Sequence, residues 1–188
     1  MLEVNFDPFP ELSTARLTMR RIIPADIPAI FELRSNTKVM EYIEHGFAHK
    51  LQDAEIHFGK IDDGIINNTG INWAITLKND TGKMIGIIGL WRLIKEHYRA
   101  EIGYSLHPDH WRKGIMKEAM NEVMNYGFYE LKLHSVEAQI NPANIASATL
   151  LQGAGFKQEG YFKENYFANG KFGDTAVYSC LAPVNVCT

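Results

Sequence analysis

Residues Arg99 to Met116 read RAEIGYSLHPDHWRKGIM and give the strongest indication of the fold. Its first part, Arg99–Leu106, is rich in strand-forming residues and is ended by a His-Pro-Asp sequence. Apolar residues then recur every three or four positions over Gly114–Gly127, which predicts an amphipathic helix. A glycine at a helix start exposes consecutive backbone N–H groups, and Arg112 and Lys113 add positive charge. The stretch predicts either a strand–loop–helix unit that binds an anion such as a pyrophosphate, or an ordinary turn with solvated basic residues.

Strand-like and helix-like segments alternate on both sides of this unit. Further strands are expected at 16–21, 71–77, 83–93 and 132–139 and around turns at Asn169-Gly170 and Gly173-Asp174, and further helices from Pro24, at 52–61 and at 145–152. The Asn-Asp-Thr-Gly sequence at 79–82 predicts an antiparallel hairpin between two of the strands. No low-complexity linker interrupts the alternation, so we expect one mixed α/β domain over residues 1–188.

Composition excludes several classes of protein. The 188 residues are 46% hydrophobic and carry a net charge of −3, values typical of a folded globular domain rather than a disordered chain. The mild negative charge argues against nucleic acid as a partner. The most apolar run, residues 84–91, is too short to cross a membrane, and the acidic N-terminus does not resemble a secretion signal. The two cysteines, Cys180 and Cys187, form no metal or redox motif, so a cytoplasmic location is expected.

A second stretch with polar residues at regular spacing begins where the strand at 132–139 ends. It reads NPANIAS over residues 141–147, an Asn-Pro turn leading into a helix. Asn144 and Ser147 are three positions apart, so an amide and a hydroxyl would lie on one helix face and could point into one cleft. The alternative is that Asn144 only caps the helix and that Ser147 is a small surface residue.

Together the two stretches resemble the GNAT superfamily of acetyl-CoA-dependent N-acetyltransferases. Within it they look most like the Rim-type branch, which includes enzymes that acetylate the N-terminal amine of ribosomal proteins. The motifs that carry the resemblance are Leu12–Leu17, Ala100–Tyr104, Arg112–Ile115, the Asn141, Asn144 and Ser147 series, Gly155-Phe156, and Asn169-Gly170-Lys171 with Asp174. The resemblance implies an α/β GNAT fold: a mixed, mainly antiparallel central sheet with two helices on each side. It also implies a V-shaped split between the strands at 99–106 and 132–139, flanked by Leu106 and Gln139.

The resemblance also implies acetyl-CoA as the co-substrate and indicates where it binds. The family's phosphate loop, [Gln/Arg]-x-x-Gly-x-[Gly/Ala], reads WRKGIM here: Gly114 matches, whereas Trp111 and Met116 depart from the pattern. Backbone amides bind the phosphates, so the departures are accommodated if both side chains point away. The cofactor-binding residues are then Leu106, Arg112, Lys113, Gly114, Ile115, Met116, Asn141, Asn144 and Ser147, of which Asn144 matches the asparagine that binds the pantetheine amide.

The chemistry implied is direct transfer of an acetyl group from a thioester to a neutral amine. Glu101, on the strand that leads into the split, is the candidate general base, with a solvated strand-edge carboxylate as the plainer interpretation. Many members place a tyrosine seven residues after the asparagine, but Leu151 stands there. Ser147 is therefore the candidate donor to the departing thiolate, with Tyr166 a weaker one. Glu137 and Glu164 are the alternative bases.

The acceptor expected first is the N-terminal α-amine of a protein, because an α-amine loses its proton more easily than a lysine. A small amine such as a polyamine or an aminoglycoside is the alternative, and an acyl-CoA-binding sensor without catalysis is a third interpretation. The histidine pairs 45/49 and 107/110 lack further ligands, so no metal is expected. The aromatic residues near the C-terminus predict core packing or a homodimer contact; they are Tyr161, Phe162, Tyr166, Phe167 and Phe172.

Overall fold

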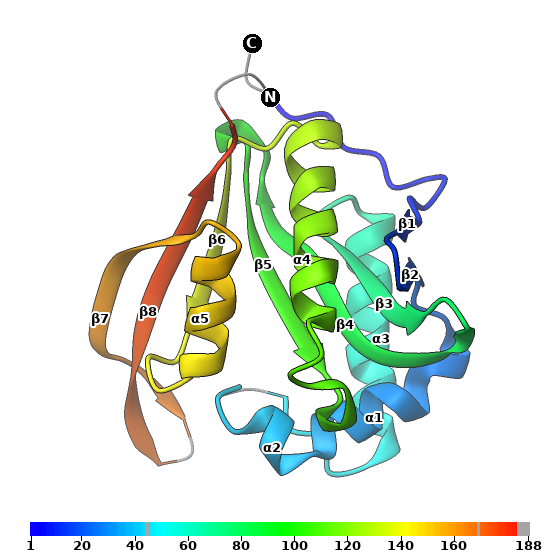
Figure 1. The fold of residues 1–188 in the computed structure, drawn as a ribbon. Coiled ribbons are helices and arrows are strands. Elements are labelled where there is room, and N and C mark those ends of the chain that lie inside the picture. The colour runs from blue at the N-terminus through cyan, green and yellow to red at the C-terminus, as the bar shows by residue number, and fades with distance from the viewer. Residues whose placement is uncertain (44–45, 169, 184–188) are drawn as a thin grey trace.

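The computed structural model describes residues 1–43, 46–168 and 170–183. Within these residues, eight strands form one sheet in the order β1-β2-β3-β4-β5-β6-β8-β7 (Figure 1). The strands are β1 (Leu12–Ser13), β2 (Leu17–Arg21), β3 (Ile71–Leu77), β4 (Asp80–Ile94), β5 (Arg99–Leu106), β6 (Ser135–Ile140), β7 (Lys157–Ala168) and β8 (Lys171–Leu181). Every neighbouring pair is antiparallel except β5 and β6, which are parallel. The predicted mixed and mainly antiparallel sheet is confirmed.

Helices cover both faces of the sheet. They are α1 (Ile27–Ser35), α2 (Thr37–Met40), α3 (Leu51–Ile66), α4 (Ile115–Asn125) and α5 (Ile145–Gly153). Figure 1 shows α4 and α5 over one face and α1 and α3 over the other, as predicted. The short α2, whose N-cap Asn36 accepts from the N–H of Lys38, was not predicted. No helix among the described residues is long and apolar enough to span a membrane.

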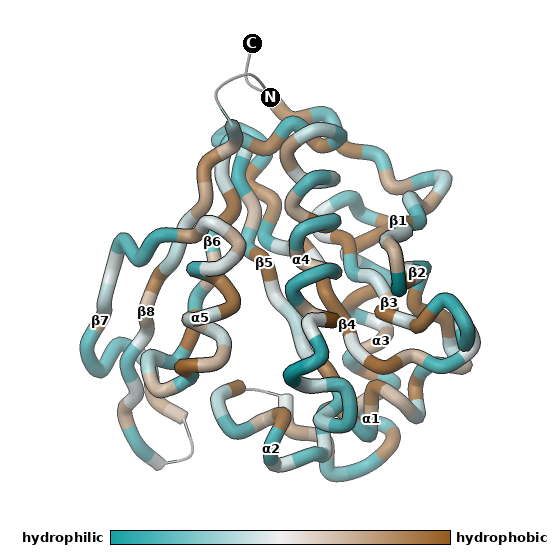
Figure 2. Tube along the Cα trace, in the orientation of Figure 1, coloured by the Kyte–Doolittle hydropathy of each residue, from teal (hydrophilic) through white to brown (hydrophobic). Residues whose placement is uncertain are grey.

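The core lies on both faces of the central strands, against α4 on one side and against α1 and α3 on the other. Figure 2 shows hydrophobic residues concentrated along β3 and β4, with hydrophilic residues on the loop before α4. Trp73 of β3 is fully buried, and its ring meets Tyr126, at the C-terminal end of α4, edge to face with centroids 5.3 Å apart. The Trp73 indole N–H also donates to the Pro10 carbonyl at 2.7 Å, so the N-terminal segment is fixed to the same core.

The predicted split between the two parallel strands is present. β5 and β6 pair only from Arg99 opposite Ser135 to Glu101 opposite Glu137. Beyond that point β5 continues to pair with β4 as far as Leu106, while β6 continues along β8 as far as Ile140. The two strands thus diverge with their facing edges unpaired, because each follows its other neighbour.

Three local predictions were wrong. The Leu12–Leu17 motif, which the family resemblance implies is an opening strand, is broken after Ser13, because the Thr14 N–H donates to the Leu17 carbonyl in a turn. The strand predicted from Lys132 begins at Ser135, because Leu133 instead closes the turn after α4 by donating to Gly127.

The third wrong prediction is the turn at Gly173-Asp174, which lies inside β8. The position of Gly173 in the strand requires glycine, because the Cβ of any other residue would overlap the Tyr166 ring on the neighbouring strand. The predicted turn residue Asn169 and the cysteine Cys187 lie outside the described residues.

Candidate functional site

The loop between β5 and α4 is held in a defined shape by hydrogen bonds and by its backbone conformation. The indole N–H of Trp111 donates to the carbonyl of Leu106 at 2.7 Å, which ties the loop to the end of β5. Arg112 and Gly114 both have left-handed backbone conformations, with φ of 58° and 72°. Left-handed residues close to right-handed ones turn successive N–H groups toward one side, an arrangement that binds anions. Gly114 is also the N-cap of α4, so the positive end of the helix dipole lies at the same place.

The large apolar side chains of the loop point away from its backbone amides. Ile115 and Met116 are buried in the core, with 4% and 9% of their surfaces exposed. Trp111 bonds back to β5 rather than covering the helix start. The two departures from the family pattern, Trp111 and Met116, thus both have side chains that are engaged elsewhere. Residues 112–116 fit a pyrophosphate, because they combine available amides, a helix N-terminus and the cations of Arg112 and Lys113.

Opposite this loop, at the split, a hydroxyl from the start of α5 meets a hydroxyl from β5. Asn144 is the N-cap of α5, and its Oδ1 accepts from the Ser147 N–H at 3.0 Å. Asn144 thus caps the helix. Ser147 is buried rather than on the surface, and its Oγ lies 2.6 Å from the hydroxyl of Tyr104 on β5. Burial raises the pKa of Tyr104 to about 12, although the hydrogen bond with Ser147 opposes this, so the phenol stays protonated at neutral pH.

Asn141 lies where β6 ends and contacts a different hydroxyl. Its Oδ1 accepts from the Ala143 N–H at 2.9 Å, and its Nδ2 donates to the Tyr166 hydroxyl at 3.2 Å. The Tyr166 ring packs against Gly173. Tyr166, the weaker candidate donor, thus lies beside Asn141, whereas Ser147 is hydrogen-bonded to Tyr104.

Glu101 lies where the split narrows, in the last residue pair shared by β5 and β6. Its Oε2 accepts from Arg92 at 2.9 Å, and only 11% of its side chain is exposed. Burial raises the pKa of Glu101 and outweighs the opposing effect of Arg92. The alternative of a solvated strand-edge carboxylate is therefore wrong. On the neighbouring strand, Glu137 forms an ion pair with Arg99 and accepts from the Gln139 amide.

The hydroxyl pair and Glu101 lie on opposite faces of the sheet. One row of paired residues crosses β3, β4 and β5: Trp73, Ile88 and Tyr104. Trp73 lies on the face covered by α4, because its ring contacts Tyr126 at the end of that helix. Tyr104 therefore faces α4 and α5. Successive residues of a strand point to opposite faces, so Glu101, an odd number of positions from Tyr104, and its partner Trp91 face the side of α1 and α3. Glu101 and Tyr104 are three positions apart, about 10 Å along the strand.

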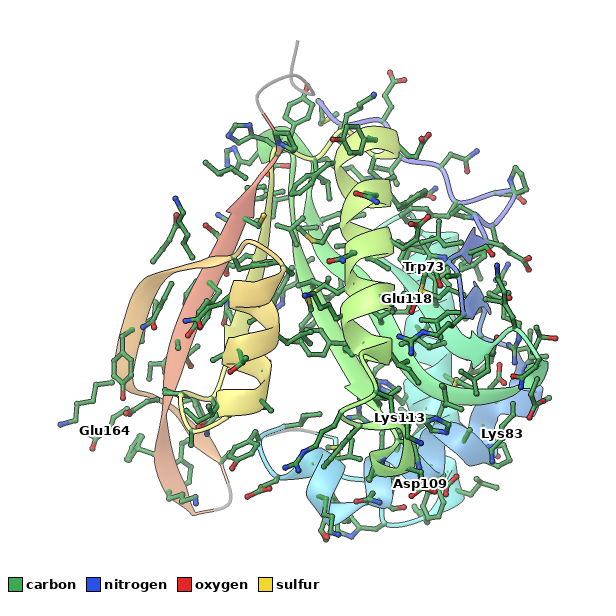
Figure 3. The ribbon with its side chains drawn as sticks, viewed as in Figure 1. Trp73, Lys83, Asp109, Lys113, Glu118 and Glu164 are labelled. Atoms are coloured by element: carbon green, nitrogen blue, oxygen red, sulfur yellow. The ribbon has the colours of Figure 1, made fainter. Side chains whose placement is uncertain are left out.

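The remaining candidates lie away from this point or have other contacts. Glu164 lies on the outer strand β7 and projects away from the sheet (Figure 3). The Nε2 atom of His107 lies 3.1 Å from Oε1 of Glu32 on α1, a contact that links α1 to the loop. His45 lies outside the described residues, and the described part of the chain has no group of three metal-ligating side chains.

Tyr104 is the residue that the sequence reasoning missed. Its partner lies 43 residues away in the sequence, so no local spacing reveals the contact. The alternation of β5 was an available signal, because it places Tyr104 on the same face as the buried Ile102 and Leu106.

Comparisons with known proteins agree with this geometry. Residues 16–157 match the family model described as an acetyltransferase (GNAT) domain. The chain is 37% identical to the uncharacterized N-acetyltransferase YoaA of Bacillus subtilis over 93% of this chain and 98% of the relative. It is similar in fold to the Vibrio cholerae spermidine N-acetyltransferase in complex with CoA and spermine (TM-score 0.79, 24% identity, covering 89% and 96% of the two chains). It is also similar in fold to RimL, a ribosomal L7/L12 alpha-N-protein acetyltransferase in complex with coenzyme A (TM-score 0.83, 18% identity, covering 92% and 98%). The chain therefore belongs to the GNAT family and is an N-acetyltransferase.

Proposed function

We propose that the protein transfers an acetyl group from acetyl-CoA to the N-terminal α-amine of a protein, such as a ribosomal protein, by direct attack on the thioester. Acetyl-CoA supplies the activated acetyl group. Residues 112–116 bind its pyrophosphate through their backbone amides, helped by Arg112 and Lys113. Leu106, Asn141 and Asn144 line the split, where the unpaired edges of β5 and β6 face the pantetheine arm. The left-handed conformations at residues 112 and 114 support this placement.

Glu101 accepts the proton of the acceptor amine, directly or through a water molecule. Its raised pKa makes it a better base than an exposed carboxylate, because an efficient base has a pKa close to the working pH. As the N–C bond forms and the C–S bond breaks, Ser147 donates a hydrogen bond to the departing thiolate. Tyr104 supports Ser147, since its phenol can donate a hydrogen bond to Ser147 Oγ while Ser147 donates to the thiolate; the two hydroxyls then act as a relay.

The observation that favours an α-amine is the charge balance at the narrow end of the split. Glu101 is paired with Arg92 and Glu137 with Arg99, so each carboxylate there is matched by a guanidinium. A polyamine carries several positive charges and binds best to carboxylates that lack such partners. An α-amine has a pKa of about 7.7–8.0 and reaches the site neutral at little cost. The local charges thus suit an acceptor with one weakly basic amine.

The test is thiol release from acetyl-CoA with three acceptors: a peptide with a free N-terminus, the same peptide N-acetylated but with a lysine, and spermidine. We expect turnover with the free N-terminus and little with the other two. Preferred turnover of spermidine would instead establish a small-amine acetyltransferase. CoA binding without turnover on any acceptor would establish a sensor.

The placement of acetyl-CoA is tested separately with Gly114→Val, because a β-branched residue is strained at a φ of 72°. The variant should bind CoA more weakly in calorimetry. Gly59→Val is the control, since a Cβ at Gly59 meets nothing within 4 Å. Unchanged CoA affinity in folded Gly114→Val would contradict the placement.

A further inference from the structure

Arg16 comes from the turn between β1 and β2 yet bonds to the loop before α4. Its Nη1 donates to the carbonyl of Lys113 at 2.9 Å. Its Nε forms an ion pair with Oε2 of Glu118, in the first turns of α4, at 2.6 Å. Figure 3 shows Lys113 on the loop and Glu118 above it on α4. One guanidinium therefore connects the loop to the helix that follows it.

Glu118 is itself held in place by the same turn. Its Oε1 accepts from the backbone N–H of Arg16 at 2.9 Å and from the hydroxyl of Thr14. Burial alone would raise the pKa of Glu118, but the hydrogen bonds from Thr14 and Arg16 outweigh it and lower the pKa. The carboxylate is thus ionised at neutral pH and fixes the orientation of the Arg16 fork.

The contact with Lys113 determines where the next amide points. A trans peptide is planar, so its C=O and N–H groups point in opposite directions. Because the Lys113 carbonyl points at Arg16, the N–H of Gly114 must point away from Arg16, out of the loop. That N–H belongs to the set proposed above to bind the pyrophosphate.

We propose that Arg16, held by Glu118, is a positioning residue for CoA: it fixes the Lys113–Gly114 peptide so that the Gly114 amide is already oriented toward the pyrophosphate. This inference rests on the proposed placement of CoA on residues 112–116. Arg16 acts through the peptide group, and its own charge is compensated by Glu118.

Two substitutions test whether Arg16 acts by positioning the Lys113–Gly114 peptide or only by attracting the pyrophosphate with its charge. Arg16→Lys keeps the positive charge but loses the planar fork that reaches two acceptors. Glu118→Gln removes a negative charge near the anion but weakens the hold on Arg16. Positioning predicts that both variants bind CoA about 10-fold more weakly by calorimetry, the scale of one charge-assisted hydrogen bond. If Arg16 acts only by attracting an anion, Arg16→Lys should bind CoA normally, and Glu118→Gln should bind CoA normally or more tightly. Either result overturns the proposal.

A matched control and a second donor complete the experiment. Arg21→Gln breaks an ion pair of similar exposure, with Asp62, without touching the loop, and should leave the affinity for CoA unchanged. Acetyl-pantetheine lacks the pyrophosphate, so its kcat/KM should be the same in Arg16→Lys and in the unsubstituted protein, whereas kcat/KM for acetyl-CoA falls. An equal fall with both donors would show a general structural defect and overturn the proposal.

The Gly114→Val experiment separates the placement of CoA from the positioning role of Arg16. If Gly114→Val weakens CoA binding and Arg16→Lys does not, the placement of CoA stands and only the positioning role is wrong. If Gly114→Val binds CoA normally, the placement is wrong, and the positioning role falls with it.

Discussion

The two faces of the sheet at the split are built from different chemistry. On the α4 and α5 face, Tyr104 and Ser147 form a partly buried, uncharged hydroxyl pair. On the α1 and α3 face, Glu101 and Arg92 form an ion pair at the end of the shared register. A neutral face suits a thioester and its departing sulfur, and a charged face suits the exchange of a proton. The proposed base and the proposed donor therefore lie on opposite sides of the sheet.

The largest effect is expected from Glu101→Gln, which removes the proposed base and changes little in size. The kcat should fall by about 10²–10⁴-fold, the contribution of a positioned general base. The loss should shrink as the pH approaches the pKa of the acceptor, where the free amine needs no base. The measurement is a pH–rate profile, with CoA affinity as the control for binding. Near-normal turnover at neutral pH would leave Glu101 with a structural role only and direct the search to Glu137.

Substitution on the opposite face should give a smaller and pH-independent loss. Ser147→Ala removes the donor to the thiolate, and a hydrogen bond to a charged group corresponds to a loss in kcat of about 10–100-fold. Because the donor acts after deprotonation, the defect should persist at high pH. Tyr104→Phe should resemble it if the two hydroxyls act as a relay, and thermal unfolding checks that both variants are folded. A loss for Ser147→Ala that disappears at high pH would contradict the assignment of the two faces.

Trp111→Phe tests whether the loop is tied to β5 by the indole. The substitution removes the bond to the Leu106 carbonyl, so KM for acetyl-CoA should rise by about 2–10-fold with little change in kcat. Tyr129→Phe, an exposed aromatic residue at the far end of α4, is the control. A fall in kcat at unchanged KM would show that Trp111 acts on the chemistry rather than on the loop.

The smallest effect is a shift in pH dependence. Arg92 lowers the pKa of Glu101, so Arg92→Gln should raise it further. Glu101 acts in its ionised form, and the acid limb of kcat/KM should therefore move to higher pH, with the plateau at high pH nearly unchanged. Arg21→Gln should leave the limb in place. A shift to lower pH would show that the limb reports another group.

Local patterns in the sequence predicted most of the sheet. The strands at 71–77 and 99–106 have the predicted bounds, because turn residues or proline follow them directly. The split was predicted from the family resemblance and is confirmed by the short register of β5 and β6. The predicted start at Lys132 was wrong because a bond to Gly127, outside the strand, decides the conformation there.

The site was predictable only where its residues are close in the sequence. Asn144 and Ser147 are three residues apart and were identified as a pair. Tyr104 and Ser147 are 43 residues apart, and Arg16 and Glu118 are 102 apart, so only the folded sheet brings them together. Periodicity predicts which face of an element is buried, but it does not predict which polar groups meet across two elements.

The unpaired edges of β5 and β6 also have a consequence for thermodynamic linkage. A ligand that binds only the folded chain raises its free energy of unfolding, by about 2.7 kcal/mol at a concentration 100 times its Kd. In the split, that ligand would take the place of the strand pairing that ends at Glu101. The stability of the protein is then coupled to the supply of its co-substrate, so the melting temperature becomes a measure of how much acetyl-CoA or CoA is bound.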